Sequence, residues 1–225
     1  MNIKHRIASR FQPPRLAALF ALPAVCFFAG CSDPSDKVAK TTGTEAKETT
    51  PAAPSAREYV VRAESTIGFV GSKVTGSHNG GFKQFAGKVK VADGKIAATD
   101  LKIAMASTWA DNDRLTGHLK SPDFFDVAKF PTSTFTLTSV ETSSAQKTVT
   151  GNLDLHGVTK SITFPADVQI AADAVTVKAE FAINRKDFNI NFPGKPNDLI
   201  RDNVVLKLDL KATPGAARPE DQLPN

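Results

Sequence analysis

The sequence predicts an all-β protein, built as an extended antiparallel barrel of eight strands with one short helix near the barrel mouth. Apolar and polar residues alternate over most of the region 59–212, which gives each segment one dry face and one wet face. Such alternation is typical of antiparallel sheet. Turn-forming pairs such as Asp93-Gly94 separate the alternating segments. Closure into a barrel hides the edges that a sheet of this size would otherwise expose.

The predicted strands follow this alternation in order. It is clearest near the end of the domain, where Val175, Val177 and Phe181 share one face. The glycine-rich stretch around His78 is expected to be a turn. The predicted strands are 59–63, 66–75, 81–92, 95–107, 131–141, 146–156, 159–171 and 174–184, with 203–211 closing the set.

One segment, 111–120, departs from the alternation. Asp111 is a candidate N-cap, and Leu115 lies four residues before Leu119 on one helical face. Two adjacent phenylalanines, Phe124 and Phe125, follow this segment. We expect a short amphipathic helix that covers one mouth of the barrel together with these two aromatic side chains.

The N-terminus has the features of a bacterial lipoprotein signal peptide. A basic start precedes an apolar run over 16–29, which is too short and too interrupted by Pro23 to span a bilayer as a helix. Small residues precede Cys31 in the string Phe28-Ala29-Gly30-Cys31. We expect residues 1–30 to be removed and Cys31 to carry a diacylglyceryl thioether and an N-acyl chain. The alternative is an ordinary secretory signal that is cleaved elsewhere.

The net charge of +5 is mostly a property of this predicted signal peptide. Residues 1–30 hold four basic and no acidic side chains, so the predicted mature chain has 24 Lys and Arg against 23 Asp and Glu. This balance, without a basic stripe, argues against nucleic-acid binding. Loss of Cys26 and acylation of Cys31 leave no thiol for a disulfide or a metal site.

Two flanking segments are predicted to be unstructured. Residues 31–58 contain no aromatic residue after Cys31 and read as a disordered tether, and residues 213–225 read as a flexible tail. The folded domain is therefore 59–212, held near a membrane but outside it. The serine at position 32 favours the outer membrane, with the domain facing the periplasm.

Catalytic and metal-binding patterns find little support in the sequence. His78, His118 and His156 are assigned to three separate elements without ligand spacing. The sequence has neither a Gly-X-Ser-X-Gly elbow nor a phosphate-binding glycine loop. We therefore predict a protein that is not an enzyme and that has no metal site and no cofactor.

The interior of the predicted barrel is rich in aromatic residues, since the domain holds eleven of the fifteen phenylalanines. A barrel of eight strands is near the size at which side chains either fill the interior or leave room for one ligand. Both interpretations, a solid core and an elongated apolar cavity, stay open at this point.

Several motifs, in order along the domain, resemble the YceI-like family. The most recognisable one contains Ser121-Pro122-Asp123-Phe124-Phe125-Asp126, and a second is Gly151-Asn152-Leu153-Asp154-Leu155-His156-Gly157. One departure is Asn189, where glycine is expected. The similar segments are 65–69, 80–87, 113–135, 151–160, 184–188 and 200–204.

The resemblance implies a lipocalin-like barrel around an apolar tunnel that binds a long polyisoprenoid, an isoprenoid quinone or a similar lipid. Arg185 and Asp187 are expected as polar contacts at the rim. The expected ligand contacts are Phe69, Leu101, Ile103, Met105, Trp109, Leu115, Phe124, Phe125, Phe135, Leu153, Leu155, Phe164, Phe181 and Ile183.

The predicted partners are thus an apolar lipid and, through Cys31, a membrane; a homodimer is left open. Two other functions remain as alternatives. One is a structural or partner-binding envelope lipoprotein with a solid barrel, and the other is an enzyme that acts on a bound lipid.

Overall fold

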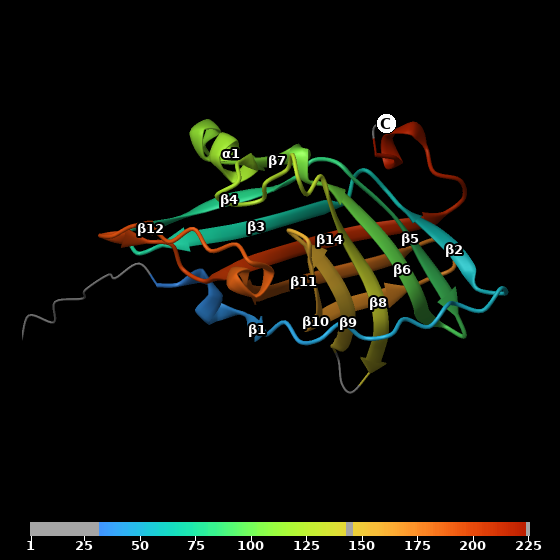
Figure 1. Cartoon of the computed structure of the whole chain (residues 1–225). Helices are drawn as coiled ribbons and strands as arrows, with labels where there is room; N and C mark the ends of the chain where they lie inside the picture. The colour runs from blue at the N-terminus through green and yellow to red at the C-terminus, as the bar shows by residue number, and fades with distance from the viewer. Residues whose placement is uncertain (1–31, 143–145, 224–225) are drawn as a thin grey trace, which may run out of the picture. The chain divides into compact units, whose positions relative to one another are not determined.

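The computed structural model describes residues 32–142 and 146–223 (Figure 1). Long antiparallel strands dominate it. None of the helices in these two ranges is long and apolar enough to span a bilayer. The elements are η1 (Pro34–Lys37), β1 (Ala39–Thr41), β2 (Arg57–Val61), β3 (Thr66–Lys73), β4 (Gly76–Phe82), β5 (Phe85–Ala92), β6 (Lys95–Ala104), η2 (Met105–Ser107), β7 (Thr108–Ala110), α1 (Asp113–Lys120), β8 (Thr132–Thr142), β9 (Lys147–Leu155), β10 (Val158–Ile170), β11 (Val175–Asn184), η3 (Arg185–Phe188), β12 (Gly194–Lys195), β13 (Asp198–Leu199), β14 (Asn203–Pro214) and η4 (Pro219–Asp221).

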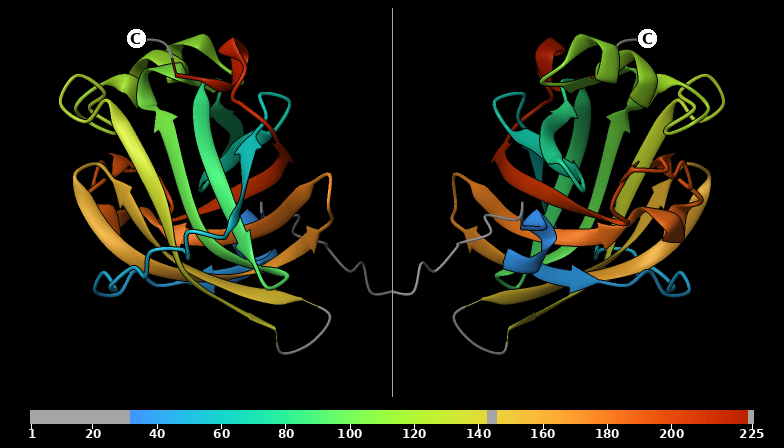
Figure 2. Two further views of the ribbon diagram at one scale, coloured as in Figure 1. Left: turned by 90° about the vertical axis from the view of Figure 1, so that its right-hand side faces the viewer. Right: turned by 90° about the vertical axis from the view of Figure 1, so that its left-hand side faces the viewer.

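Eight strands form a closed antiparallel barrel, which confirms the predicted fold class. Their order around the barrel is β11-β10-β9-β8-β6-β5-β2-β14, and β14 pairs back with β11 along the whole length of that strand. Figure 2 shows these strands curving around a common interior. Apolar side chains fill most of this interior because each strand turns alternate residues inward.

At one end of the barrel the sheet is extended by three further strands. Along β14, Ala212–Pro214 pair with β2, whereas Val205–Asp209 pair with β3. Next to β3 lie β4 and then β7; in Figure 1 α1 is drawn above β4 and beside β7. Besides β11, β14 therefore pairs with two strands in succession along its length, first β3 and then β2. The helix α1 lies over the end formed by β3, β4 and β7.

The predicted strand 81–92 is interrupted in the structure, and the predicted turn at His78 is wrong. The chain runs as a strand through His78 in β4, breaks at 83–84 and continues as β5. The glycines of β4 do not form a turn; they let neighbouring side chains and strands pack closely against β4. A Cβ at Gly80 would lie 2.3 Å from the ring of Phe69 and 2.6 Å from the carbonyl oxygen of Trp109. Neighbouring strands can approach this closely only where a side chain is missing.

The predicted helix is present as α1, with a different N-cap. Asn112, not Asp111, caps it, because the Asn112 Oδ1 accepts a hydrogen bond of 3.0 Å from the backbone N–H of Leu115. Asp111 instead accepts a hydrogen bond from the Asn79 N–H and contacts the His78 ring. It thereby joins β7 to β4.

Part of the predicted tether is ordered, so the prediction of disorder for 31–58 is wrong for that part. Residues 33–47, which we call the N-terminal strap, lie along the outside of the barrel. Within the strap, β1 pairs in parallel with β11, and Thr44 forms an isolated bridge with Ser161 of β10. The low apolar content indicates that the strap has no core of its own, but strand edges of the barrel supply its hydrogen-bond partners.

The predicted tail is also ordered in part. Residues 215–223, which we call the C-terminal clasp, fold back onto the barrel and contain η4. Asp221 is only 1% exposed and accepts a hydrogen bond of 2.7 Å from the Arg62 Nη1. A buried ion pair, and not apolar packing, holds this segment in place. The low apolar content of the segment therefore could not predict that it is ordered. The predicted signal peptide and Cys31 lie outside the described residues.

Candidate ligand-binding cavity

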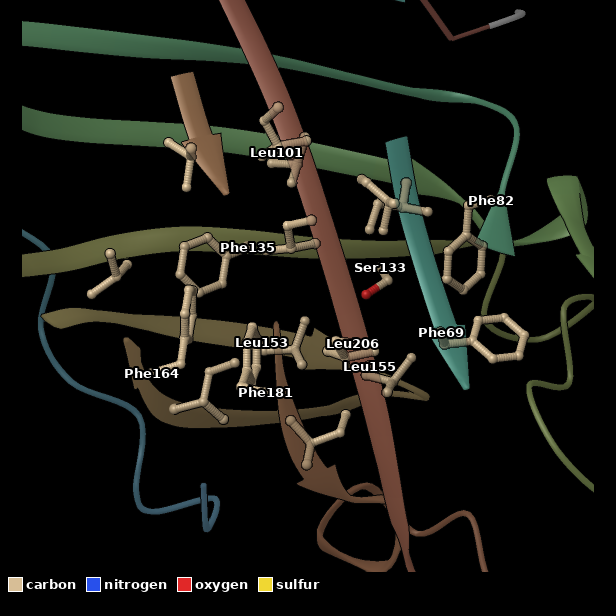
Figure 3. A pocket seen from close by; sticks show the side chains of 18 of the residues that line it. Phe69, Phe82, Leu101, Ser133, Phe135, Leu153, Leu155, Phe164, Phe181 and Leu206 are labelled. Atoms are coloured by element: carbon tan, nitrogen blue, oxygen red, sulfur yellow. The ribbon is translucent and has the colours of Figure 1, made fainter. Parts of the chain in front are cut away.

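The barrel encloses an apolar cavity of about 220 Å³ (Figure 3). All eight barrel strands contribute side chains to it, together with β3, β4, α1 and the segments that follow α1 and η3. The polar or charged residues among those that line it are Lys88, Thr99, Ser133 and Arg185. The side chains therefore do not fill the barrel completely, and the space they leave is lined by hydrocarbon.

Strand periodicity places these side chains. On β9, Val149, Leu153 and Leu155 point inward, and the outward residue Asn152 bonds to the strap. On β14, Val204, Leu206, Leu208, Leu210 and Ala212 all line the cavity. Because successive side chains of a strand point to opposite faces, these runs follow directly from the alternation in the sequence.

Twelve of the fourteen residues expected to contact a ligand line the cavity. They are Phe69, Leu101, Ile103, Met105, Phe124, Phe125, Phe135, Leu153, Leu155, Phe164, Phe181 and Ile183. Trp109 and Leu115 lie away from it. The Trp109 Nε1 packs 3.0 Å from the position that a Cβ of Gly81 would occupy, and Leu115 packs on the edge of the core. Contact of the twelve with a ligand stays a prediction.

One wall of the cavity was not predicted from the sequence. The leucines of β14 alternate with polar residues as clearly as those of any other strand, and Leu206, Leu208 and Leu210 line the cavity although only a role in closing the sheet is expected for this strand. Ile190 and Ile200, on either side of β12 and β13, line it as well. Those two residues belong to an irregular segment, where periodicity gives no signal.

Aromatic side chains gather at two places in the cavity. At one, the rings of Phe164 and Phe181 are stacked with centroids 4.0 Å apart, and Phe135 packs against Phe164 at 5.9 Å. At the other, Phe82 and Phe125 lie 5.9 Å apart, and each also contacts Phe69. Figure 3 shows the Phe135 and Phe164 rings on one side and the Phe69 and Phe82 rings on the other. The aromatic residues thus mark both ends of the space.

Arg185 does not have the position at the rim that we expected. It is 5% exposed, and its guanidinium donates hydrogen bonds to the carbonyl oxygens of Ile190, Ile200 and Arg201. Burial lowers the pKa of Arg185, and the nearby Asp202 carboxylate opposes that shift. The side chain remains charged, since arginine is protonated throughout the accessible pH range. Arg185 therefore fixes the irregular segment that supplies Ile190 and Ile200.

Asp187 also has a structural partner in place of a solvent-facing role. Its Oδ2 accepts a hydrogen bond of 2.8 Å from the backbone N–H of Gly43 in the strap. Two residues later, Asn189 adopts the left-handed conformation with φ of 57° and ends η3. Asparagine tolerates this conformation better than most residues, so it can stand where glycine was expected.

The three histidines of the domain lie apart and have separate partners. The His78 Nδ1 contacts Asp111 at 2.7 Å, the His118 Nε2 contacts Asp123 at 2.8 Å, and the His156 Nδ1 contacts the carbonyl oxygen of Phe188 at 3.1 Å. Within the described parts of the chain, no three His, Cys, Asp or Glu side chains are grouped so as to hold a metal ion.

Comparison with known proteins agrees with this architecture. The YceI-like domain matches residues 59–212. A UPF0312 protein of Pseudomonas putida is 34% identical over 155 residues, which are 62% of this chain and 79% of the relative. Protein YceI of Salmonella newport is 33% identical over 147 residues, 60% of this chain and 77% of the relative.

Two solved structures share the fold. BcnA of Burkholderia cenocepacia superimposes with a TM-score of 0.61 at 26% identity, covering 67% of this chain and 98% of BcnA. A polyisoprenoid binding domain from Saccharophagus degradans, implicated in plant cell wall breakdown, gives a TM-score of 0.57 at 19% identity and covers 71% of this chain and 99% of that domain. With a closed antiparallel barrel and a match that spans this whole domain, the chain belongs to the YceI-like family.

Proposed function

We propose that this protein binds a long-chain apolar lipid, of the polyisoprenoid or isoprenoid quinone type, and stores or carries it in the bacterial cell envelope. The observation that carries this proposal is the cavity of about 220 Å³ with its hydrocarbon lining. An engineered apolar cavity of ~150 Å³ stays dry and binds benzene, so this space suits a larger apolar group. The polyisoprenoid-binding domain with the same fold supports the choice of lipid class.

The driving force follows from the burial of hydrocarbon. Each methylene group removed from water contributes ~0.8 kcal/mol, so ten such groups contribute ~8 kcal/mol before the costs of association. Methylene packing discriminates poorly between chains of similar width. The cavity therefore selects a lipid by its apolar chain.

Substitution of Leu153 by Trp tests the proposal. The side chain of Leu153 lines the cavity, so the larger indole would extend into the space of the ligand. Val74→Trp is the matched control, because Val74 is 54% exposed and does not line the cavity. Lipids extracted from the purified full chain would be identified by mass spectrometry.

We expect one apolar lipid class in the wild type and in Val74→Trp, and about tenfold less of it in Leu153→Trp. Equal amounts in all three proteins, or no apolar lipid in the wild type, would reject the cavity as a lipid site. A solid structural barrel would then be the better interpretation.

We also propose that acylated Cys31 anchors the protein to the outer membrane on its periplasmic side. The basic start, the short apolar run and the small residues before Cys31 support this. The Cys31→Ser variant should lose the acyl mass from its N-terminal peptide and leave the membrane fraction. A wild-type N-terminus that begins elsewhere, or that carries no acyl group, would contradict the anchor.

A binding role without catalysis completes the proposal. Each of the three histidines of the domain already has a polar partner outside the cavity lining. We expect alanine at His78, His118 and His156 together to leave lipid occupancy unchanged. Chemical conversion of the bound lipid by the wild type, and not by this variant, would favour the enzyme alternative.

A further inference from the structure

The barrel wall is incomplete between β10 and β11. These strands pair over only four positions next to their connecting turn, from Asp167↔Lys178 to Ile170↔Val175. Both strands continue well beyond this point. On their other edges β10 pairs with β9 over nine positions, and β11 pairs with β14 over ten. The edges of 158–166 and 179–184 that face each other are therefore not joined directly by a ladder.

The N-terminal strap occupies this interruption. Ala39, Lys40 and Thr41 pair in parallel with 181–183 of β11, and Thr44 exchanges two backbone hydrogen bonds with Ser161 of β10, of 2.9 and 3.0 Å. The Thr163 N–H donates to the Thr41 hydroxyl at 3.1 Å. The strap thus bonds to both open edges and serves as a short piece of the wall.

Directly beneath the strap lies the aromatic end of the cavity. The stacked rings of Phe164 and Phe181 come from the two strands that the strap separates. Ile162 and Ile183, from the same two strands, also line the cavity. Release of the strap would leave only these side chains between the cavity and the outside.

The strap has fewer strand-pairing contacts than the barrel strands. Its own ladder has three positions and one isolated bridge, and Ala39, Lys40 and Thr44 are exposed. Ser161 is 2% exposed although it points outward, and its hydroxyl has no hydrogen-bond partner among the described residues. Segments with few buried apolar contacts open at lower free energy than the rest of a protein.

We propose that the N-terminal strap is a lateral gate, whose release between β10 and β11 lets a long apolar chain enter the cavity sideways. The inference rests on the proposed lipid-binding function. A sideways opening suits a long chain, because the chain can enter along its length without threading through a barrel mouth. The strap also begins next to the proposed anchor, because its first residue, Asp33, lies two positions after Cys31. The Asp33 carboxylate contacts the Arg201 guanidinium at 3.6 Å.

A reversible disulfide tests this gate. Thr44 and Ser161 are a hydrogen-bonded antiparallel pair, for which the Cα atoms lie ~5.5 Å apart, within the range for a disulfide. The full chain with Thr44→Cys and Ser161→Cys would be compared oxidised and reduced. The measurement is the rate at which a dansyl-labelled farnesyl chain enters, followed by fluorescence.

Two controls match this variant. Ala86→Cys with Lys102→Cys joins the paired strands β5 and β6 elsewhere in the wall. Thr44→Cys alone shows whether a new cysteine at position 44 affects uptake through the cysteines that the chain already has. We expect oxidation to slow uptake about tenfold or more only in the pair across the gate. Asp187→Ala, which removes the acceptor of the Gly43 N–H, should speed uptake instead.

The outcomes separate the two proposals. Equal uptake by the oxidised and reduced gate variant, or equal slowing by the β5–β6 disulfide, would overturn the gate and leave lipid binding intact. Failure of every form, including the wild type, to take up the farnesyl chain would overturn the proposed function and the gate with it.

Discussion

The N-terminal strap and the C-terminal clasp both lie outside the 59–212 domain, and both dock on the barrel by different means. The strap is joined by backbone hydrogen bonds to strand edges, and its side chains are mostly exposed. The clasp is joined by the buried carboxylate of Asp221, which accepts hydrogen bonds from Arg62, Arg218 and the backbone N–H of Ala63.

This difference predicts different behaviour. Water can replace the exposed hydrogen bonds of the strap one at a time as it lifts away. Removing one partner of a buried ion pair instead leaves a charge without compensation, so the clasp should be docked permanently. The contrast supports a releasable strap at the cavity and a fixed closure at the C-terminal end of the chain.

The largest expected effect is at the clasp. Asp221→Ala leaves the guanidinium of Arg62 buried without its carboxylate and should lower the free energy of unfolding by about 3–5 kcal/mol. Urea denaturation measures this change. Asp167→Ala, at an exposed acid of β10, should change it by less than about 0.5 kcal/mol. Similar values for the two variants would show that the clasp does not contribute to stability.

Acid should weaken the clasp through the same carboxylate. Hydrogen bonds from Arg218, from Arg62 and from the backbone hold the pKa of Asp221 well below its usual range. The stability that comes from the ionised form is therefore complete above the unfolded pKa of about 3.9 and is lost as the pH falls below it. The urea midpoint should fall more steeply for the wild type than for Asp221→Asn between about pH 5 and about pH 3, a range that brackets the unfolded pKa of ~3.9. Parallel curves would contradict this assignment.

Glycine substitutions compare the two segments directly. Gly215, at the start of the clasp, has φ of 113°, which a side chain makes unfavourable, so Gly215→Ala should cost about 1–2 kcal/mol. A Cβ at Gly43 in the strap would lie 3.1 Å from the Lys160 side chain, and the exposed strap can shift to relieve this contact. We expect Gly43→Ala to cost under about 1 kcal/mol in thermal unfolding. The reverse order would mean that the strap is the more rigidly fitted of the two.

The smallest expected effect is at the strap itself. Asp187→Ala removes one hydrogen bond, worth about 0.5–1.5 kcal/mol, and should act locally. Amide hydrogen exchange over 39–44 should become faster, whereas global unfolding stays nearly unchanged. Asp187→Asn keeps an acceptor oxygen and should restore most of the protection. A large fall in global stability would show that the strap is an integral part of the barrel.

Much of the barrel could be predicted from local pattern. The alternation over Val175, Val177, Phe181 and Ile183 predicted both the strand and its inward face, because each residue's direction follows from its place along a strand. The same rule accounts for nine of the twelve expected residues that line the cavity, those on strands, whereas Met105, Phe124 and Phe125 lie outside the strands. It failed for Trp109, which follows the 3-10 turn η2, and it misread the glycines of β4 as a turn, since close packing against Phe69 is a tertiary requirement.

By itself, then, the sequence determined the class of fold, the helix and an apolar interior, since each depends on the order of apolar and polar residues along a few neighbours. Only the tertiary structure decided that the N-terminal strap and the C-terminal clasp are ordered. Gly43 meets Asp187, and Arg62 meets Asp221, only after the barrel has brought together residues that are 144 and 159 positions apart. Hydrogen bonds and ion pairs of that kind need a partner at a specific place in space, and composition along the chain carries no record of it.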